Sequence, residues 1–173
     1  MKYFTREIVD GEVGADEGTN WINLFFENEK RYYDQLKNLK PRLNVTTFKF
    51  FTSVSLHDSL LVSVKIVDKE SEANLLDKKY RQRQYPTDVS ILILHLHGKY
   101  LYDLEYSCVR NIDIDLPSDA KEPSICLPMD LGWWRYDELT AKDDKFMGHD
   151  ILFHSGTILS LEFKSVKVKR RKK

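Results

Sequence analysis

The feature that most constrains the fold is an apolar pattern of period two, which recurs in two separate stretches. In residues 60–67, aliphatic side chains at even positions alternate with a more mixed set at odd positions. In residues 88–106 the same period runs to Gly98 and resumes with Tyr100 after it. Successive side chains of a β-strand point to opposite faces of a sheet. The pattern therefore predicts strands in both stretches, with Gly98 in a tight turn that makes the second an antiparallel hairpin. Because 88–96 is apolar on both faces, it is predicted to be a central strand covered on both sides.

One stretch has the longer period of an α-helix. Thr19 and Asn20 are suitable caps for its start, and Pro41 ends it because the proline ring disfavours helical geometry at the preceding residue. Between these points apolar side chains recur at helical spacing. The stripe consists of Trp21, Leu24, Phe25, Tyr32, Leu36 and Leu39.

Shorter elements are predicted around these. Residues 2–5 and 110–114 are candidate strands, and the period of two is expected to begin at Thr46. A closing hairpin runs through 149–153, turns at Ser155-Gly156 and returns through 158–168, where a β-bulge near Ser165 would explain a change of apolar parity. Residues 68–86 are rich in charge and predict a long connection with one helical turn, and three prolines predict an irregular crossing that leads to Trp133.

These elements predict one α+β domain, a twisted antiparallel sheet of about six strands with one long N-terminal helix packed across a face. The length of 173 residues suits a single domain that buries a core without a disulfide or a metal. We assign residues 1–168 to this domain and residues 169–173 to a basic C-terminal tail, which is expected to be solvated. Cys108 and Cys126 are predicted to be reduced thiols.

Charge and hydropathy limit the partners. The 27 basic and 27 acidic side chains balance, whereas a nucleic-acid-binding protein normally carries a basic excess. Without the tail Lys169–Lys173 the chain has 22 basic side chains against 27 acidic, so its body is acidic and suits a basic partner surface. The N-terminus becomes charged at once and the apolar runs are short, which predicts a cytoplasmic location without membrane association.

Histidines are the candidates for metal chemistry. His95 and His97 stand at i and i+2 of a strand and so point to the same side, where His149 or His154 would supply a third ligand. The alternative is that they are ordinary polar or core groups. The dyad His57-Asp58 opens a strand, where Asp58 is expected to accept backbone N–H groups instead of taking part in catalysis.

Enzyme motifs are otherwise missing from the sequence. It contains no Gly-x-Ser-x-Gly elbow, no phosphate-binding glycine loop and no dinucleotide fingerprint. The carboxylate pairs Asp103/Glu105 and Asp113/Asp115 are expected to be solvated on polar strand faces. The missing motifs therefore favour a non-enzyme without a cofactor, and an enzyme that uses the strand-borne histidines is the alternative.

Residues 133–138 form the densest chemical cluster. Aromatic side chains beside an arginine are typical anchors of protein interfaces, although they also fill cores. Two adjacent tryptophans on an extended chain cannot point the same way, so one is expected in the core and the other on the surface. The predicted protein-binding residues are Trp133, Trp134, Arg135, Tyr136 and Glu138.

Three short motifs resemble a bacterial family of unknown function. They are the opening Met1–Thr5, the central Leu56–Ser59 followed by alternating aliphatics, and the closing His149–Phe153 with Gly156 in the turn after it. The family has no established activity, so the resemblance implies a small bacterial cytosolic protein and supplies no catalytic residue. Small bacterial α+β proteins of this general appearance often act as immunity proteins against secreted toxins.

Three functional hypotheses follow. The first is a non-enzymatic protein-binding module, in its specific form a toxin-neutralising immunity protein. The second is a small-molecule or metal-dependent enzyme that uses His95, His97 and a third histidine. The third is nucleic-acid binding through the basic tail at residues 169–173.

Overall fold

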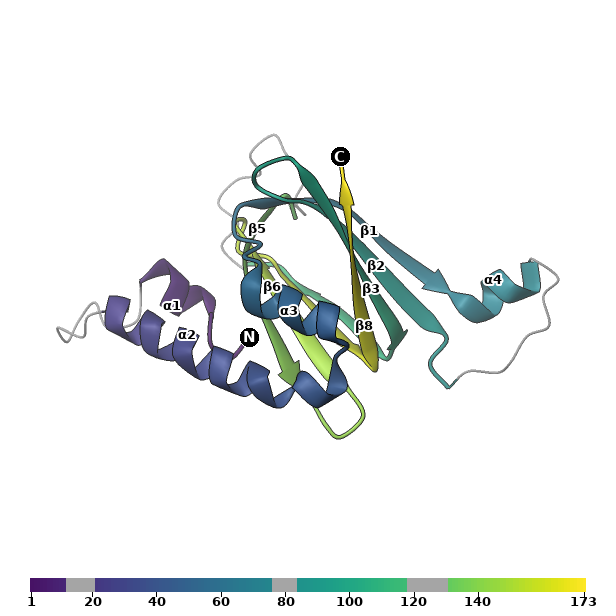
Figure 1. Cartoon of the computed structure of the whole chain (residues 1–173), viewed down its shortest axis with the longest axis horizontal. Helices are drawn as coiled ribbons and strands as arrows, with labels where there is room; N and C mark the ends of the chain where they lie inside the picture. The colour runs from purple at the N-terminus through teal and green to yellow at the C-terminus, as the bar shows by residue number, and fades with distance from the viewer. Residues whose placement is uncertain (12–20, 76–83, 118–130) are drawn as a thin grey trace.

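The computed structural model describes residues 1–11, 21–75, 84–117 and 131–173. Within them the chain is an α+β fold on one antiparallel sheet of eight strands (Figure 1). The helices are α1 (Arg6–Asp10), α2 (Trp21–Asn38), the 3-10 turn η1 (Lys40–Arg42), α3 (Val45–Ser53) and α4 (Lys69–Leu75). The strands are β1 (Ser59–Asp68), β2 (Thr87–Leu94), β3 (Tyr100–Val109), β4 (Asn111–Asp115), β5 (Trp133–Ala141), β6 (Met147–Phe153), β7 (Ile158–Phe163) and β8 (Ser165–Lys172).

The strand order is β4-β7-β6-β5-β1-β2-β3-β8. Only Arg110 separates β3 from β4, and only Lys164 separates β7 from β8. Strands β3 and β4 therefore form one long bent strand, and β7 and β8 form another. These two run side by side, because β3 pairs with β8 and β4 pairs with β7. On its other side the sheet is joined by a short contact, in which β1 pairs with β5 through Ser59 and Leu60 alone. The sheet is therefore curled. Its two halves, β8-β3-β2-β1 and β4-β7-β6-β5, are joined on one side by the chain connections at Arg110 and Lys164 and on the other by the short pairing of β1 with β5.

The sheet has eight strands and not the six predicted, and two regions explain the difference. Residues 133–141, expected at the end of an irregular crossing, form strand β5. The parity change near Ser165 is a strand boundary and not a bulge, since β7 pairs with β6 whereas β8 pairs with β3. The bend at Lys164 changes which alternate side chains face the core.

Two segments that were predicted as extended are not strands. No strand forms at residues 2–5, and the short α1 follows them, so the long helix α2 is not the first element. Residues 45–53 form α3, although their β-branched and aromatic side chains favour strands. Asn44 caps this helix by accepting a hydrogen bond from the Thr47 N–H at 2.9 Å.

The hairpin of β2 and β3 is confirmed. Gly98 occupies its turn with a φ of 65°, a left-handed conformation that suits glycine. Only one face of β2 is fully covered, because Val89, Ile91 and Ile93 are buried while the alternate residues are half-buried. The prediction that both faces would be covered was therefore too strong.

The core lies between the inner face of the curled sheet and helices α2 and α3. In Figure 1, α3 crosses in front of the sheet between β6 and β8. It buries Phe50 and Phe51, and α2 buries Tyr32 and Leu36. Burying a large apolar side chain contributes about 1.5–3 kcal/mol. The fully buried strand residues include Ile91, Ile93, Leu104, Tyr106, Trp134, Leu139, Met147, Ile151, Phe153 and Phe163.

The basic C-terminal residues belong to the sheet. Strand β8 continues to Lys172, so the boundary predicted at residue 168 falls inside a strand. Lys169 pairs with Glu105, and the Arg170 guanidinium lies 4.9 Å from the centre of the Tyr100 ring. These side chains are an exposed, charged edge of the sheet and not a separate solvated tail.

Among the described residues, no helix combines the length and the apolar character needed to cross a membrane.

Candidate functional site

The two tryptophans of the predicted interface differ completely in exposure. Trp133 is 51% exposed, whereas Trp134 is fully buried. The Trp134 indole N–H donates a hydrogen bond to Asp137 at 2.9 Å. One tryptophan is thus in the core and the other on the surface, as expected for neighbours on a strand, and only Trp133 is available to a partner.

Arg135 and Tyr136 are engaged within the molecule. The Arg135 guanidinium pairs with Asp10 of α1 at 2.6 Å. The Tyr136 ring stacks on Phe4, with ring centres 5.2 Å apart, and its partial burial raises the pKa of its hydroxyl. Both side chains therefore attach the N-terminal region to β5.

Glu138 is not a surface residue. Its side chain is fully buried, and its carboxylate accepts hydrogen bonds from the backbone N–H groups of Lys2, Tyr3 and Phe4. A buried carboxylate is tolerated only when its oxygens have such donors. Glu138 anchors the N-terminal segment, so its predicted role in binding another protein does not fit its position.

Helix α2 covers the edge of β5 near its middle. The Leu139 N–H donates to the Tyr32 hydroxyl at 3.2 Å, and the Gln35 side-chain amide donates to the Leu139 carbonyl at 2.6 Å. Burial, together with the Asp137 carboxylate, raises the pKa of Tyr32 well above its ordinary value. Side chains of α2 thus take the place of a neighbouring strand along this edge.

Strand β1 pairs with β2 along one edge, and its other edge differs from the edge of β5 that α2 covers. After its short contact with β5, β1 makes one more backbone hydrogen bond on that side within the described ranges, from the Leu61 N–H to the Gly132 carbonyl at 2.8 Å. Over Val62–Asp68, no strand or backbone hydrogen bond occupies this edge within the part of the chain that the structure describes. Val62 and Ile66 are 49% and 56% exposed. Figure 1 shows this strand at the outside of its half of the sheet.

Among the described residues, neither His149 nor His154 joins His95 and His97 in a group of three ligands, as the alternative hypothesis of a metal-dependent enzyme requires. His149 is fully buried, with Nδ1 2.6 Å from the Tyr106 hydroxyl and Nε2 3.0 Å from the Asp137 carboxylate. Burial raises the pKa of Tyr106 well above its ordinary value. His149 is a hydrogen-bonded core residue and does not join His95 and His97.

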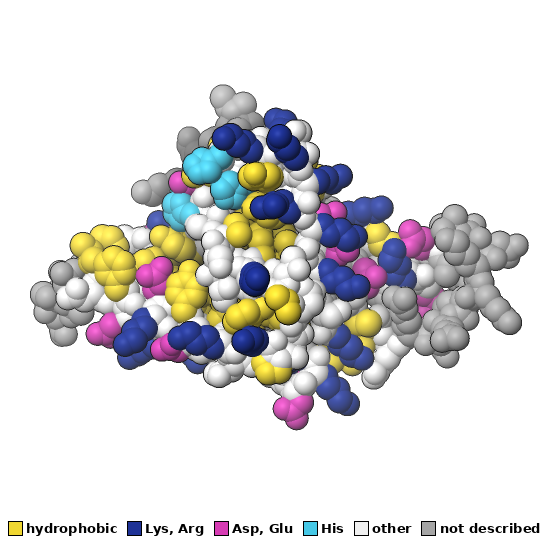
Figure 2. All heavy atoms as spheres, viewed as in Figure 1, with side chains coloured by type: hydrophobic (Ala, Val, Ile, Leu, Met, Phe, Trp, Pro, Cys, Tyr) yellow, Lys and Arg dark blue, Asp and Glu magenta, His cyan; other side chains and the backbone are white. Residues whose placement is uncertain are grey.

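His95 and His97 lie together at the end of β2, with ring centres 5.3 Å apart. They line a groove of about 570 Å³, and His57 and Asp58 also line it. Among the described residues, the buried Nδ1 of His95 has no hydrogen-bond partner. In Figure 2 histidine side chains gather in one place on the visible face, beside Lys and Arg side chains.

A third group of side chains comes together around Asp58. One carboxylate oxygen lies 3.0 Å from His57 Nδ1 and the other lies 3.0 Å from His154 Nε2. Asp58 therefore bonds to imidazoles instead of backbone N–H groups. Burial raises its pKa, but the hydrogen bonds and charges of the two histidines outweigh this and hold the pKa below its ordinary value. The sequence alone does not reveal this group, because His154 lies 96 positions from Asp58 along the chain.

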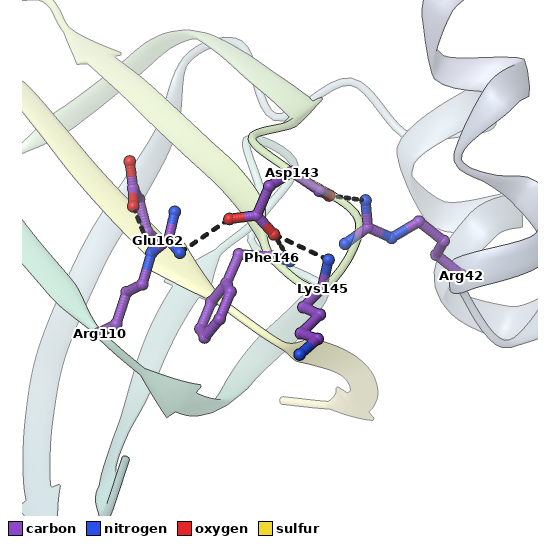
Figure 3. A network of polar contacts seen from close by, with 6 residues as sticks. All are labelled: Arg42, Arg110, Asp143, Lys145, Phe146 and Glu162. Carbon is purple, nitrogen blue, oxygen red and sulfur yellow. Dashed lines mark hydrogen bonds and ion pairs between the residues drawn. The ribbon is translucent and has the colours of Figure 1, made fainter. Parts of the chain in front are cut away.

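Another polar network fixes the turn between β5 and β6 (Figure 3). Arg110 pairs with Asp143 at 2.8 Å and with Glu162 at 2.7 Å. Asp143 also accepts the backbone N–H groups of Lys145 and Phe146, and these bonds with the Arg110 pair hold its pKa below the ordinary value, against a smaller opposing effect of burial. Its backbone carbonyl accepts a hydrogen bond from Arg42 of η1. The network ties the chain after α2 to the sheet.

The remaining predicted groups lie apart from these clusters. Asp103 accepts a hydrogen bond from the Ser90 hydroxyl at 2.6 Å, and Asp115 pairs with Arg6 at 3.1 Å. Cys108 is a free thiol, and Cys126 lies outside the described residues.

Comparison with known proteins adds no function. No protein-family model matches the chain, and no curated protein matches it. A solved structure that does match is an uncharacterized protein from Neisseria gonorrhoeae, at 14% identity and a TM-score of 0.39. The match covers 66% of this chain and 93% of that chain. A likeness this distant carries no argument, and the resemblance to a bacterial family of unknown function stays a prediction.

Proposed function

We propose that the protein is a protein-binding module whose partner adds an extended segment to the edge of β1. The observation that carries the proposal is the edge at Val62–Asp68, which has no neighbouring strand among the described residues. Such an edge presents a row of backbone N–H and C=O groups with which another strand can pair. Many peptide-binding domains recognise their ligands by adding a strand in this way.

The other two sheet edges are less suited to pairing. Strand β4 has only five residues, and two of them are the carboxylates Asp113 and Asp115. Strand β8 ends in the exposed basic run Lys169–Lys172. Short edges and charged side chains are the usual means by which proteins prevent unwanted strand pairing. The edge of β1 is longer and exposes Val62 and Ile66, with Lys65 as its one cation.

Trp133 supplies an aromatic anchor at one end of this edge. It pairs in register with Leu60, at the point where β5 leaves β1, and half of its surface is exposed. Tryptophan is among the residues that contribute most to binding energy at protein interfaces. The expected partner segment is therefore extended and apolar, with backbone hydrogen bonds along β1 and a contact to Trp133.

The specific role that we propose is neutralisation of a toxin in a bacterial cytoplasm. What supports it is the lack of enzyme motifs in the sequence and the family resemblance of its short motifs.

The test is an affinity capture from source cells with three baits, read by mass spectrometry. The baits are the wild-type protein, the double variant Val62→Lys/Ile66→Lys and the control Val45→Lys. Val45 is 71% exposed on α3, so the control introduces one lysine away from the edge, where the edge variant introduces two on it. A stoichiometric partner is expected with the wild type and the control but not with the edge variant.

Two results would contradict this account. A partner that the edge variant retains and that Trp133→Ala loses would place the interface on the tryptophan alone. The absence of any stoichiometric protein would contradict a binding module and direct attention to ligands of the histidine groove.

A further inference from the structure

We infer that His57, Asp58 and His154 form a binding site for a divalent transition metal ion such as Zn²⁺. Two imidazoles and one carboxylate each offer a ligand atom, and these atoms all lie within 4.8 Å of one another. This ligand set suits zinc and neighbouring first-row metals, whereas Ca²⁺ and Mg²⁺ prefer oxygen ligands. The inference does not depend on the proposed protein partner.

The backbone holds the ligands in place. The Asp58 N–H donates to the Trp134 carbonyl at 2.8 Å, and the His154 N–H donates to the Trp133 carbonyl at 2.9 Å. Two ligands from distant parts of the chain are thus fixed by adjacent carbonyls at the start of β5. Asp58 has a φ of 59°, a left-handed conformation that aspartate adopts more readily than most residues, in the turn that leads into β1.

The His57 ring is positioned by its neighbours. It meets the Tyr136 ring edge to face, with ring centres 5.1 Å apart, and the His154 ring at 5.7 Å. Because Tyr136 is itself packed against Phe4, the imidazole rests on a fixed aromatic surface. Ligands with preorganised rotamers bind metal more tightly than ligands that must be ordered on binding.

Metal binding would replace two hydrogen bonds with stronger contacts. The distances of 3.0 Å from Asp58 to each histidine nitrogen are only slightly shorter than the spacing of ligand atoms around a tetrahedral zinc, about 3.3 Å for bonds of about 2.0 Å. The two contacts use different oxygens of Asp58, and the three ligand atoms all lie within 4.8 Å of one another, so the widest separation would close by at most about 1.5 Å around the ion. In the complex the metal-bound imidazoles are neutral and the Asp58 carboxylate is ionised, so the ligand set would bring one negative charge to the cation.

Three protein ligands leave one tetrahedral position free for water or a small ligand, as in catalytic zinc sites. His57 and Asp58 also line the groove with His95, His97 and Lys99. The free position therefore adjoins a basic, histidine-lined hollow. A small anion or a carboxylate is the chemical class that would bind there, in contact with the metal and near the Lys99 ammonium.

The direct test uses Zn²⁺ alone, titrated calorimetrically into chelator-treated protein at neutral pH. One equivalent should bind to the wild type, and His57→Ala, Asp58→Asn and His154→Ala should each weaken binding at least about tenfold, a loss seen even for outer-sphere partners. The matched control is His97→Ala, an exposed histidine of the same groove, which should bind as the wild type does. Substitution with Co²⁺ should give visible absorption bands that the His154→Ala variant lacks.

The variants are expected to fold, since the three side chains are 39–43% exposed. Their melting temperatures without metal should match that of the wild type, whereas Zn²⁺ should raise the melting temperature of the wild type and the control alone. Wild-type binding no tighter than that of His154→Ala would overturn the inference. Binding lost in His97→Ala and kept in His154→Ala would also overturn it and place the metal on His95 and His97.

Discussion

Strands β5 and β1 separate after the same short contact, and the two edges that they present there differ. The edge of β5 is hydrogen-bonded to other parts of the chain, whereas no described residue pairs with the edge of β1. Along β5, side chains of α2 bond to both backbone groups of Leu139, and Glu138 holds the N-terminal segment beside it. Along β1 beyond Leu61, no described residue takes that role. An edge satisfied by its own chain stabilises the fold, whereas an edge left open is available to a partner. The difference predicts that changes on the β5 side alter stability and that changes on the β1 side alter binding.

The largest expected effect is at Glu138. Replacing it with Ala leaves three backbone N–H donors of the N-terminal segment without their acceptor, and should lower the free energy of unfolding by about 3–5 kcal/mol. Urea denaturation measures the loss. The control Glu105→Ala removes a half-exposed carboxylate paired with Lys169 and should cost at most about 1 kcal/mol. Equal losses in the two variants would show that the N-terminal segment is not held in this way.

Tyr32 should have a smaller effect on the same edge. Tyr32→Phe keeps the buried ring but removes the hydroxyl that accepts the Leu139 N–H, so the free energy of unfolding should fall by about 1–2 kcal/mol. Tyr33→Phe is the matched control, because Tyr33 is 42% exposed on the same helix. If both variants had the melting temperature of the wild type, the Tyr32 hydroxyl would not be a stabilising hydrogen-bond acceptor for the edge of β5.

The edge of β1 should tolerate change. Val62→Lys/Ile66→Lys alters two exposed side chains, and its free energy of unfolding should stay within about 0.5 kcal/mol of the wild type for each substitution. Thermal unfolding of the purified variant measures this. A loss of several kcal/mol would mean that the edge is covered in the folded protein, and the contrast with β5 would fail.

The smallest expected effect is a dependence of stability on pH through Asp143, in the turn between β5 and β6. Asp143 joins η1 to the β5–β6 turn, and its pKa is lower in the folded protein than its ordinary value (Figure 3). Its contribution to stability is therefore complete above the ordinary pKa of an aspartate and is lost as pH falls through the lowered folded value. Asp143→Asn should reduce the acid-induced decrease in melting temperature. An unchanged pH profile would show that the network does not contribute.

The sequence predicted the elements whose period is continuous. Helix α2 and the hairpin around Gly98 follow directly from their apolar spacing and their turn or terminating residues. Strand β5 was missed because it contains a fully buried carboxylate, Glu138, where an apolar residue would reveal the period. Helix α3 was missed because its composition favours strands, and the cap at Asn44 opposes that preference.

The candidate site was less predictable than the fold. The adjacent tryptophans predicted one buried and one exposed ring. Nothing in the sequence shows that the backbone N–H groups of the N-terminal segment donate hydrogen bonds to Glu138. The contact of Asp58 with His154 depends on where two distant segments meet the start of β5. Spacing within a strand found the pair His95 and His97, and it could not find ligands that only the tertiary structure brings together.

The most direct test of the contrast is amide hydrogen exchange of the free protein, followed residue by residue by NMR. In an antiparallel strand with one bare edge, alternate N–H groups point to solvent. We predict that every second amide of Val62–Asp68 exchanges quickly, while the Leu139 amide exchanges among the slowest of β5. Uniform protection along β1, or a fast Leu139 amide, would contradict the account that one edge is covered and the other is open.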